Sequence, residues 1–411
     1  MSNNWLLANL FFYMKKIVIT SIIVALLIIG GTTLAILYAK GYRLQLQNGK
    51  TIVAGTGILT VNSSPQGAKV YIDGNLTTAT NNQLNLAPGT YKVRIEKEGY
   101  FAWEKTLTIK KELVTEADAL LFPTTPKFEP ITISGVNNLA TDTSGTVFAY
   151  TVASASAQTD GVYILDMNSR PFFPTSGLTS QIADDTVYDL SNAYLTFSPD
   201  SDQLLASTSG TLGTTYYLLS TKSMNTTPQN VTVTLPQINQ AWQSEETLKV
   251  KKTTDALPKK VRPLASEFFK DMQVSPDQSK IFYTALKDGT LPLTITPRLP
   301  DLNTTVEQRT IKAGSQYVYD MKEDRNYLIY QKKDNQRMPH FIWFPDSMHL
   351  VFVQDKQIRV IESDGLNATT VYAGPFNDDF VAVWPDGSNL VILTNFNAST
   401  APSNLYRISL K

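Results

Sequence analysis

Hydrophobic residues follow three different patterns along this chain of 411 residues. In the first, residues 17–39 are mostly apolar and include no charged side chain. At about 1.5 Å per residue, such a run spans about 30 Å as a helix, the thickness of a bilayer's hydrocarbon core. A cleavable signal has a shorter core of about 7–15 residues and ends in a small-x-small site, where Leu37-Tyr38-Ala39 places a large residue. The run therefore predicts a transmembrane helix, with a cleaved signal or a buried soluble helix as the alternatives.

Charges on either side of this run do not fix its orientation. Lys15 and Lys16 precede it, and Lys40, Arg43 and Lys50 follow it. The number of positive charges on each side therefore does not decide which side faces the cytoplasm. Because only 16 residues precede the run and all the folded mass follows it, we expect residues 1–16 to be cytoplasmic. The bulk of the chain would then be extracytoplasmic and held at the cell membrane by a single span.

The second pattern is a series of short runs within residues 57–110 in which apolar and polar residues alternate, after a polar stalk at 40–56. Val70 and Ile72 alternate with Lys69 and Tyr71, and Asp73-Gly74 is a hairpin turn signal because glycine tolerates positive φ. Further alternation follows the Ala87-Pro88-Gly89 turn. This pattern predicts a small antiparallel β-sandwich with one face of each sheet buried.

Three segments of this second region resemble the PEGA domain. They are PQGAKVYIDG at 65–74, LAPGTY at 86–91 and EGY at 98–100, and Gln66 stands where that family's namesake turn has glutamate. The resemblance covers residues 57–110. It implies an extracytoplasmic β-sandwich of envelope proteins, and it does not imply catalysis.

The third pattern is a phrase that returns four times in the last two-thirds of the chain. Each copy ends in Pro-Asp and is followed, five residues after the proline, by an apolar triplet. Proline suits the last residue of a strand, and the aspartate can accept hydrogen bonds from backbone N–H groups of the turn, so we expect Asp200, Asp277, Asp346 and Asp386 to form turns. The four copies are Ser198-Pro199-Asp200, Ser275-Pro276-Asp277, Phe344-Pro345-Asp346 and Trp384-Pro385-Asp386.

Weaker copies of the phrase stand at Asp142, Gln243 and Glu323. Together the seven anchors are separated by between 22 residues (323 to 345) and 57 residues (142 to 199). A four-stranded blade needs about 40 residues, so we expect a β-propeller of six blades, or of seven with one degenerate. The repeats resemble those of TolB-like and WD40-like bacterial propellers.

The resulting fold class is mainly β. A linker at 111–127 joins the sandwich to a propeller at 128–411. The C-terminal segment 404–410 alternates like a strand, and we expect it to pair with 131–133, which would close the ring and leave no unpaired edge.

Composition removes several classes of function. Lys plus Arg and Asp plus Glu both number 36, and this balance argues against a nucleic-acid partner, which requires a basic field. The chain has no cysteine, so disulfides, iron–sulfur clusters and cysteine-rich zinc sites are excluded. Walker, Gly-x-Gly-x-x-Gly and Gly-x-Ser-x-Gly motifs are missing as well.

Residues that could carry catalysis or bind metal are few. The two histidines, His340 and His349, would need a third ligand to hold a metal, so we expect no metal site and no cofactor. Paired carboxylates could cleave a glycosidic bond, but neighbouring strand residues point to opposite faces, and acids in loops are usually solvated. These pairs are Asp184-Asp185, Glu245-Glu246 and Asp378-Asp379.

Two further groups have both a structural and a functional interpretation. Trp103 and Tyr100 could stack on sugars, although such aromatics more often fill a small core. A basic cluster is a solvated loop or, alternatively, a docking patch for anionic wall polymer or lipid headgroups. It comprises Lys249, Lys251, Lys252, Lys259, Lys260 and Arg262.

The sequence therefore favours a non-catalytic, membrane-tethered binding or scaffold protein of the cell envelope. Its propeller face would contact an envelope protein or a polysaccharide. The alternative is a propeller-hosted enzyme that acts on envelope glycans, which would require at least three acids or histidines to converge at the central channel.

Overall fold

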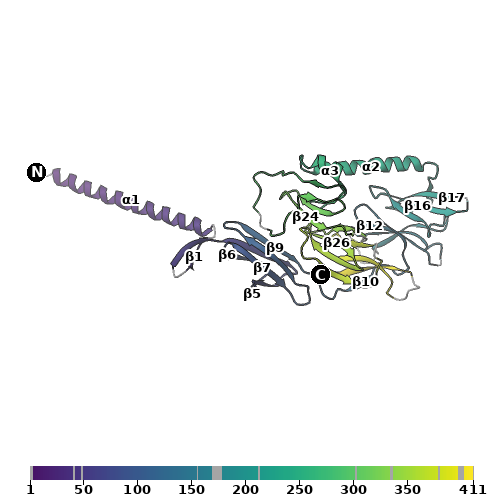
Figure 1. Cartoon of the computed structure of the whole chain (residues 1–411), viewed down its shortest axis with the longest axis horizontal. Coiled ribbons are helices and arrows are strands. Elements are labelled where there is room, and N and C mark those ends of the chain that lie inside the picture. The colour runs from purple at the N-terminus through teal and green to yellow at the C-terminus, as the bar shows by residue number, and fades with distance from the viewer. Residues whose placement is uncertain are drawn as a thin grey trace. The chain divides into compact units, whose positions relative to one another are not determined.

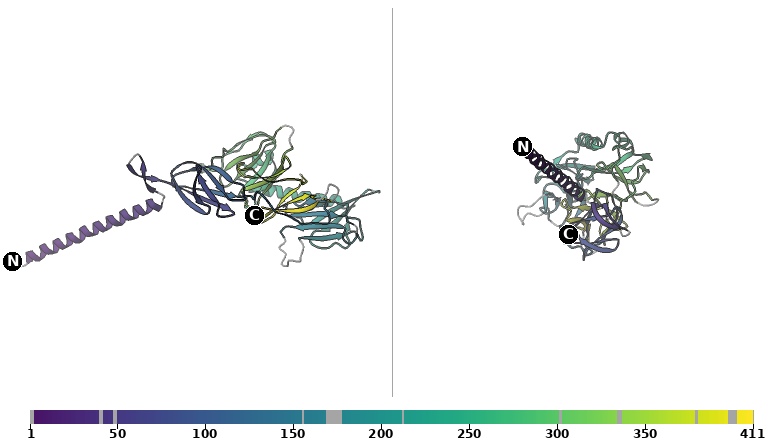
Figure 2. Two further views of the ribbon diagram at one scale, coloured as in Figure 1. Left: turned by 90° about the horizontal axis from the view of Figure 1, so that it is seen from below. Right: turned by 90° about the vertical axis from the view of Figure 1, so that its left-hand side faces the viewer.

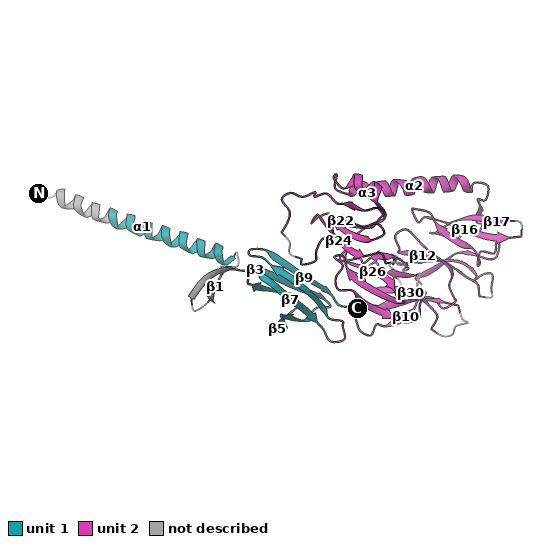
Figure 3. Ribbon diagram, viewed as in Figure 1, with its two compact units in different colours: residues 1–97, 102–121, 300–304 teal, residues 98–101, 122–299, 305–411 magenta. Residues whose placement is uncertain are grey.

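The computed structural model describes residues 3–39, 42–47, 50–154, 156–168, 178–211, 213–300, 303–333, 337–377, 380–396 and 402–410. The chain divides into two compact units, which Figure 3 shows in different colours. The first comprises residues 1–97, 102–121 and 300–304, and the second comprises residues 98–101, 122–299 and 305–411.

Helix α1 (Asn3–Ala39) begins the first unit. Its segment Met14–Ala39 has a mean hydropathy of 2.5 and is long and apolar enough to cross a membrane, and its described residues are not buried inside the protein. Thr20 and Thr33 donate their hydroxyls to the carbonyls of Lys16 (2.7 Å) and Ile29 (2.8 Å), one turn earlier. These bonds satisfy hydroxyls that would otherwise lack partners in hydrocarbon. The expected apolar helix at 17–39 is therefore confirmed.

The remainder of the first unit consists of three small sheets. A hairpin (β1–β2) is followed by a three-stranded sheet in the order β6-β3-β9 and a four-stranded sheet in the order β5-β4-β7-β8. The strands are β1 (Tyr42–Gln47), β2 (Lys50–Gly55), β3 (Gly57–Ser64), β4 (Lys69–Ile72), β5 (Asn75–Ala79), β6 (Asn82–Leu86), β7 (Gly89–Glu96), β8 (Trp103–Ile109) and β9 (Val114–Leu120).

The expected alternation in this unit is present in the structure. Val70, Val93 and Ile95 are fully buried, while Asp73 and Gly74 both have positive φ (48° and 82°) in the turn between β4 and β5. One expectation needs adjustment, because residues 114–120, which the sequence analysis placed in a linker, form β9 and pair in parallel with β3. The apolar signal of β9 is weak, since two of its buried residues are only alanines, Ala117 and Ala119.

Figures 1 and 2 show the second unit from three directions. Its described residues form five four-stranded antiparallel sheets. We number these sheets as blades I to V along the chain. Blade I is β11 (Asn137–Thr141), β12 (Val147–Val152), β13 (Gly161–Asp166) and β14 (Thr179–Asp184). Blade II is β15 (Tyr194–Phe197), β16 (Gln203–Gly210), β17 (Gly213–Ser220) and β18 (Gln229–Asn230). Blade III is β19 (Phe269–Val274), β20 (Lys280–Ala285), β23 (Gln316–Asp320) and β24 (Arg325–Tyr330).

Blade IV is β25 (Phe341–Trp343), β26 (His349–Gln354), β27 (Gln357–Glu362) and β28 (Thr369–Ala373). Blade V joins both ends of the unit, in the order β10 (Phe128–Pro130), β31 (Asn404–Ser409), β30 (Asn389–Thr394) and β29 (Val381–Val383). Phe128 pairs with Ile408, and the Ile131 N–H donates to the Leu405 carbonyl at 2.8 Å. The closure expected between the C-terminal strand and the start of the propeller is therefore present, with most of the pairing just before residue 131.

In every blade the same turn joins two strands that are consecutive along the chain, and in blade V these strands are β29 and β30. In each, the N–H of the first turn residue donates to the carbonyl five residues later, at 2.9–3.0 Å. The fourth turn residue has a φ between 60° and 71°, which is the left-handed region. The five turns begin at Asp142, Ser198, Ser275, Phe344 and Trp384.

The expected count of six blades is not confirmed, because the described residues form five four-stranded sheets in this unit. The weak copy at Gln243 is wrong, since that residue lies within helix α2 (Leu235–Ala256). Glu and Lys favour a helix there, and Lys249 interrupts the supposed apolar triplet. Glu323 lies between β23 and β24, so it belongs to the blade that Ser275 already marks.

Three additional elements interrupt the blades. Helices α2 and α3 (Arg262–Phe268) stand between blades II and III, and a two-stranded sheet of β21 (Gly289–Thr290) and β22 (Thr310–Ile311) lies between β20 and β23. Apolar side chains of adjacent blades pack together, as Phe148 of blade I does edge-on against Phe380, beside blade V, at 5.3 Å between ring centroids. Such face-to-face packing of small sheets is typical of propellers.

Candidate functional site

The four aspartates of the repeated phrase act within their own turns, as expected. Asp200 accepts from the Ser198 hydroxyl (2.6 Å) and the Asp202 N–H (3.1 Å). Asp277 accepts in the same way from Ser275 and Ser279 at 2.7–3.0 Å. Partial burial opposes ionisation of Asp277, but these hydrogen bonds and that from Lys322 hold its pKa well below the ordinary value.

The two remaining turns are built alike. Asp346 accepts from the N–H groups of Met348 (2.8 Å) and His349 (3.0 Å), and Asp386 accepts from the Ser388 N–H (2.8 Å). These carboxylates stabilise the repeated turns and provide no separate binding site.

The structure does not bring the two histidines together into a site. His349 is buried, its Nδ1 lies 2.7 Å from Asp346 Oδ2, and Phe122 and Phe344 pack edge-on against its ring. His340 lies in the segment before β25, which also contains the buried Pro339. Within the described ranges, no group of three or more His, Asp and Glu residues is placed to hold a metal ion.

The carboxylate pairs also have local roles or lie elsewhere. Asp184 accepts from the Thr186 hydroxyl (2.5 Å), and Asp185 accepts from the Leu190 N–H (2.9 Å), so both hold the turn after β14. Glu245 and Glu246 lie on α2, where Glu245 is paired with Lys249 at 3.5 Å. The third pair, at 378–379, lies outside the described residues.

The remaining candidates divide between core and surface. Trp103 is 6% exposed and belongs to the core of the first unit, whereas Tyr100 is half-buried and bridges to Pro123. The basic cluster lies on α2, on α3 and on the connection between them. Three of its members donate to backbone carbonyls: Lys249 to that of Pro199, Lys260 to that of Leu293 (3.1 Å) and Arg262 to that of Leu257 (2.8 Å).

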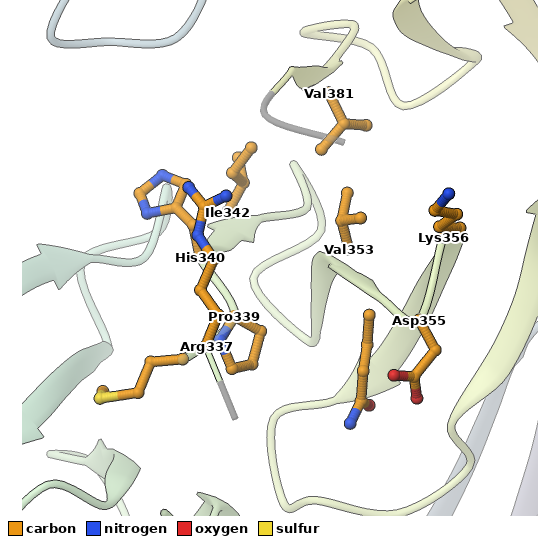
Figure 4. Close-up of a pocket in the computed structure, with 10 residues that line it drawn as sticks. Arg337, Pro339, His340, Ile342, Val353, Asp355, Lys356 and Val381 are labelled. Atoms are coloured by element: carbon orange, nitrogen blue, oxygen red, sulfur yellow. The ribbon is translucent and has the colours of Figure 1, made fainter. Parts of the chain in front are cut away.

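A pocket of about 310 Å³ lies at the junction of blades IV and V, and Figure 4 shows its lining. Its walls come from the segment before β25, from the hairpin between β26 and β27, and from Val381 at the start of β29. Since β25 and β26 are antiparallel, this end of blade IV is opposite to the end that carries the Phe344-Pro345-Asp346 turn. The pocket therefore opens on the blade ends that lack the repeated phrase.

The pocket combines an apolar centre with charged residues at its sides. Figure 4 shows Arg337 and His340 together on one side, Asp355 and Lys356 on the other, and Val353 between them. The remaining lining residues are Met338, Pro339, Ile342, Gln354 and Val381. Convergent polar groups around an apolar floor of this size are typical of a ligand-binding pocket.

Two features set the electrostatics of the pocket. Partial burial lowers the pKa of His340 below its usual value, and the negative charge of Asp271 opposes that shift. Asp355 and Lys356 have positive φ (51° and 58°), so they form the two-residue tip of the hairpin between β26 and β27. The twist of such a tip matches that of its strands, so the hairpin places these two charged residues at the rim of the pocket.

Sequence reasoning singled out only His340 among these residues, and it expected this histidine neither to bind a metal nor to act in a catalytic triad. The hairpin gave a usable signal, because Asp355-Lys356 separates two alternating apolar runs. Val381 gave none, because it reaches the pocket only through the packing of blade V on blade IV, and Arg337 stands in no motif that marks a binding residue.

A comparison with protein families agrees with the fold predicted for the first unit. Residues 56–124 match the family model described as PEGA domain. This match confirms the resemblance of the sequence, and it extends through β9. A comparison with curated proteins found no match.

Matches among solved structures include two TolB proteins. The putative TolB from Agrobacterium tumefaciens is 14% identical over 67% of this chain and 72% of its own, with a TM-score of 0.20. TolB from Acinetobacter baumannii is 11% identical over 78% of this chain and 59% of its own, with a TM-score of 0.22. A nidogen/laminin complex gives 11% identity, coverages of 64% and 73%, and a TM-score of 0.21. Similarity at this level carries no inference about function, and the description of the blades rests on their own sheet order.

Proposed function

We propose that this protein is a single-pass membrane protein whose folded units lie outside the cytoplasm and bind another component of the envelope without catalysing a reaction. The observation that carries the proposal is the Met14–Ala39 segment of α1, whose described residues are not buried by the protein, together with the PEGA match of the unit that follows it.

The exposed apolar side chains of α1 favour a surrounding medium other than water. Leu27 is 70% exposed and Leu34 is also 70% exposed, and large apolar side chains follow one another on all sides of this helix. An apolar helix without an apolar partner is stable in hydrocarbon, where its backbone hydrogen bonds are satisfied internally. At 26 residues this apolar segment is longer than the core of a cleavable signal, which is about 7–15 residues, so we favour a retained anchor.

The binding role rests on how the blades use their two ends. The repeated turns use their aspartates for internal hydrogen bonds, whereas the opposite end of blade IV carries the pocket. A propeller is a rigid scaffold, so charged side chains at such a pocket are held in place before a ligand arrives. We propose this end of blades IV and V as the contact surface.

A labelling experiment tests the topology directly, because the chain contains no cysteine. Thr77→Cys in β5 and Lys259→Cys between the helices place single thiols at exposed positions of the two units. We expect a membrane-impermeant maleimide to label both variants in intact cells, and to label Ser2→Cys only after the cells are broken. Labelling of Ser2→Cys alone in intact cells would place the folded units in the cytoplasm and refute the proposal. Release of the protein into the soluble fraction would refute the anchor.

A further inference from the structure

We infer that the pocket between blades IV and V binds a peptide segment that carries an acidic side chain next to an aliphatic one. The acidic group would lie against Arg337 and His340, and the aliphatic group would lie on Ile342, Val353 and Val381. This inference deepens the proposed function, because it assigns a partner class to the same surface: a protein rather than a polysaccharide.

The side of the pocket that carries Arg337 and His340 suits a carboxylate. A guanidinium presents paired N–H donors in a fixed plane that matches the two oxygens of a carboxylate. His340 lines the same side of the pocket in Figure 4 and supplies a further nitrogen there. On the far side, Asp355 and Lys356 present opposite charges on one hairpin tip, an arrangement that suits the N–H and carbonyl groups of a peptide backbone.

The apolar centre distinguishes a peptide from a sugar. Among the described residues, none of those that line the pocket is Phe, Tyr or Trp. The flat face of a sugar ring packs best on a flat aromatic ring, whereas Ile342, Val353 and Val381 present branched methyl groups. Branched methyl groups pack closely against aliphatic side chains, and a volume of about 310 Å³ accommodates one or two of them.

Selection from a random heptapeptide library tests the inference, because such a library samples acidic and aliphatic side chains in every order. The target is the full-length protein in lipid nanodiscs, and the matched targets are Arg337→Gln and Lys259→Gln. Each variant removes one exposed cation, but only Arg337 lines the pocket. We expect wild type and Lys259→Gln to enrich peptides with Asp or Glu next to Leu, Ile or Val several-fold, and Arg337→Gln to lose the acidic enrichment. Unchanged thermal unfolding confirms that the variants are folded.

Binding of a selected peptide gives a second readout through pH. Because its pKa is lowered, His340 is neutral near pH 7, and it gains a positive charge as the pH falls below its usual pKa of about 6.5. The charged groups that face it are Arg337, Lys356 and Asp355 of the pocket and Asp271, whose negative charge opposes the lowering of the His340 pKa. We therefore expect affinity for the acidic peptide to rise several-fold between about pH 7 and about pH 5 in wild type, and to stay constant in His340→Gln.

Three results would overturn the inference: equal acidic enrichment by wild type and Arg337→Gln, an affinity that does not change with pH in wild type, or displacement of the peptide by an oligogalacturonate whose own binding depends on Arg337. The topology experiment remains independent. If labelling fails while peptide selection succeeds, the proposed location is wrong and the pocket assignment stands. If labelling succeeds while selection fails, only the assignment of the ligand is lost.

Discussion

The buried carboxylate of Asp324 should hold the long insertion of blade III in place. Its Oδ2 accepts from the backbone N–H groups of Thr294 (2.7 Å) and Ile295 (3.0 Å). Its Oδ1 accepts from the Tyr319 hydroxyl (2.8 Å) and lies 2.9 Å from the Arg309 guanidinium. The Asp324 side chain is 3% exposed. Burial alone would raise its pKa, but these four donors outweigh burial and lower the pKa to about 2.

The lowered pKa of Asp324 sets both the size of its contribution to folding stability and the way this contribution changes with pH. From an ordinary value of 3.8 to about 2, the shift corresponds to about 2 kcal/mol of stability. Since the pKa of Asp324 is lower in the folded state than in the unfolded state, this stability is fully present above about pH 4 and is lost as the pH falls towards about 2. Asp324→Asn should lose it at pH 7 already, because a neutral amide cannot pair with Arg309.

Hydrogen exchange of the insertion measures this effect where it occurs. In Asp324→Asn, the amides of Thr294 and Ile295 should exchange about 30-fold faster at pH 7, which is about 2 kcal/mol converted at 1.4 kcal/mol per tenfold. Asp288→Asn is the matched control. Asp288 forms an ion pair with Lys312, but their side chains are 59% and 63% exposed, so we expect this variant to change amide exchange little. If Asp324→Asn and wild type exchange these two amides at the same rate, the carboxylate does not hold the insertion.

Three further predictions concern the repeated turn and the apolar segment of α1. Gly387→Ala should lower the free energy of unfolding by about 2 kcal/mol in denaturant titrations, because φ is 66° there and the new Cβ would lie 2.9 Å from the Phe344 ring. Gln278→Gly, at the equivalent position with a φ of 60°, should leave stability unchanged or raise it by up to about 1 kcal/mol in the same titrations. Leu27→Lys puts a charge near the middle of the apolar segment at a cost of about 3 kcal/mol, and it should shift the chain from the membrane to the soluble fraction.

The repeated turns could be predicted from the sequence because their chemistry is local. Ser275, Pro276 and Asp277 adopt the turn through bonds to residues no more than five positions away. Helix α2 was not predicted because Leu248 and Val250 fit by chance the apolar triplet expected at a fixed offset. Helix propensity across residues 235–256 is the stronger signal, and it depends on the whole window rather than on one spacing.

The pocket could not be predicted because its chemistry is distant along the chain. Arg337, Lys356 and Val381 are brought together only by the packing of blade IV on blade V and by the hairpin between β26 and β27. Neither the spacing of residues nor the composition of the chain predicts how one blade packs on the next. The sequence could name His340 as a candidate, but only its three-dimensional neighbours show that it lines a pocket.

The two ends of a blade differ because one end carries the same turn in all five blades, whereas the other end does not. A turn that occurs five times must close five sheets in the same way, so its polar groups are used within it, as Asp346 and Asp386 show. The opposite ends carry no such shared geometry. Blades I, II and IV join their second and third strands there through segments of different length, between residues 152 and 161, 210 and 213, and 354 and 357. Because these connections differ from blade to blade, this is the end where charged residues such as Arg337 and Lys356 can be placed for binding without loss of the repeat.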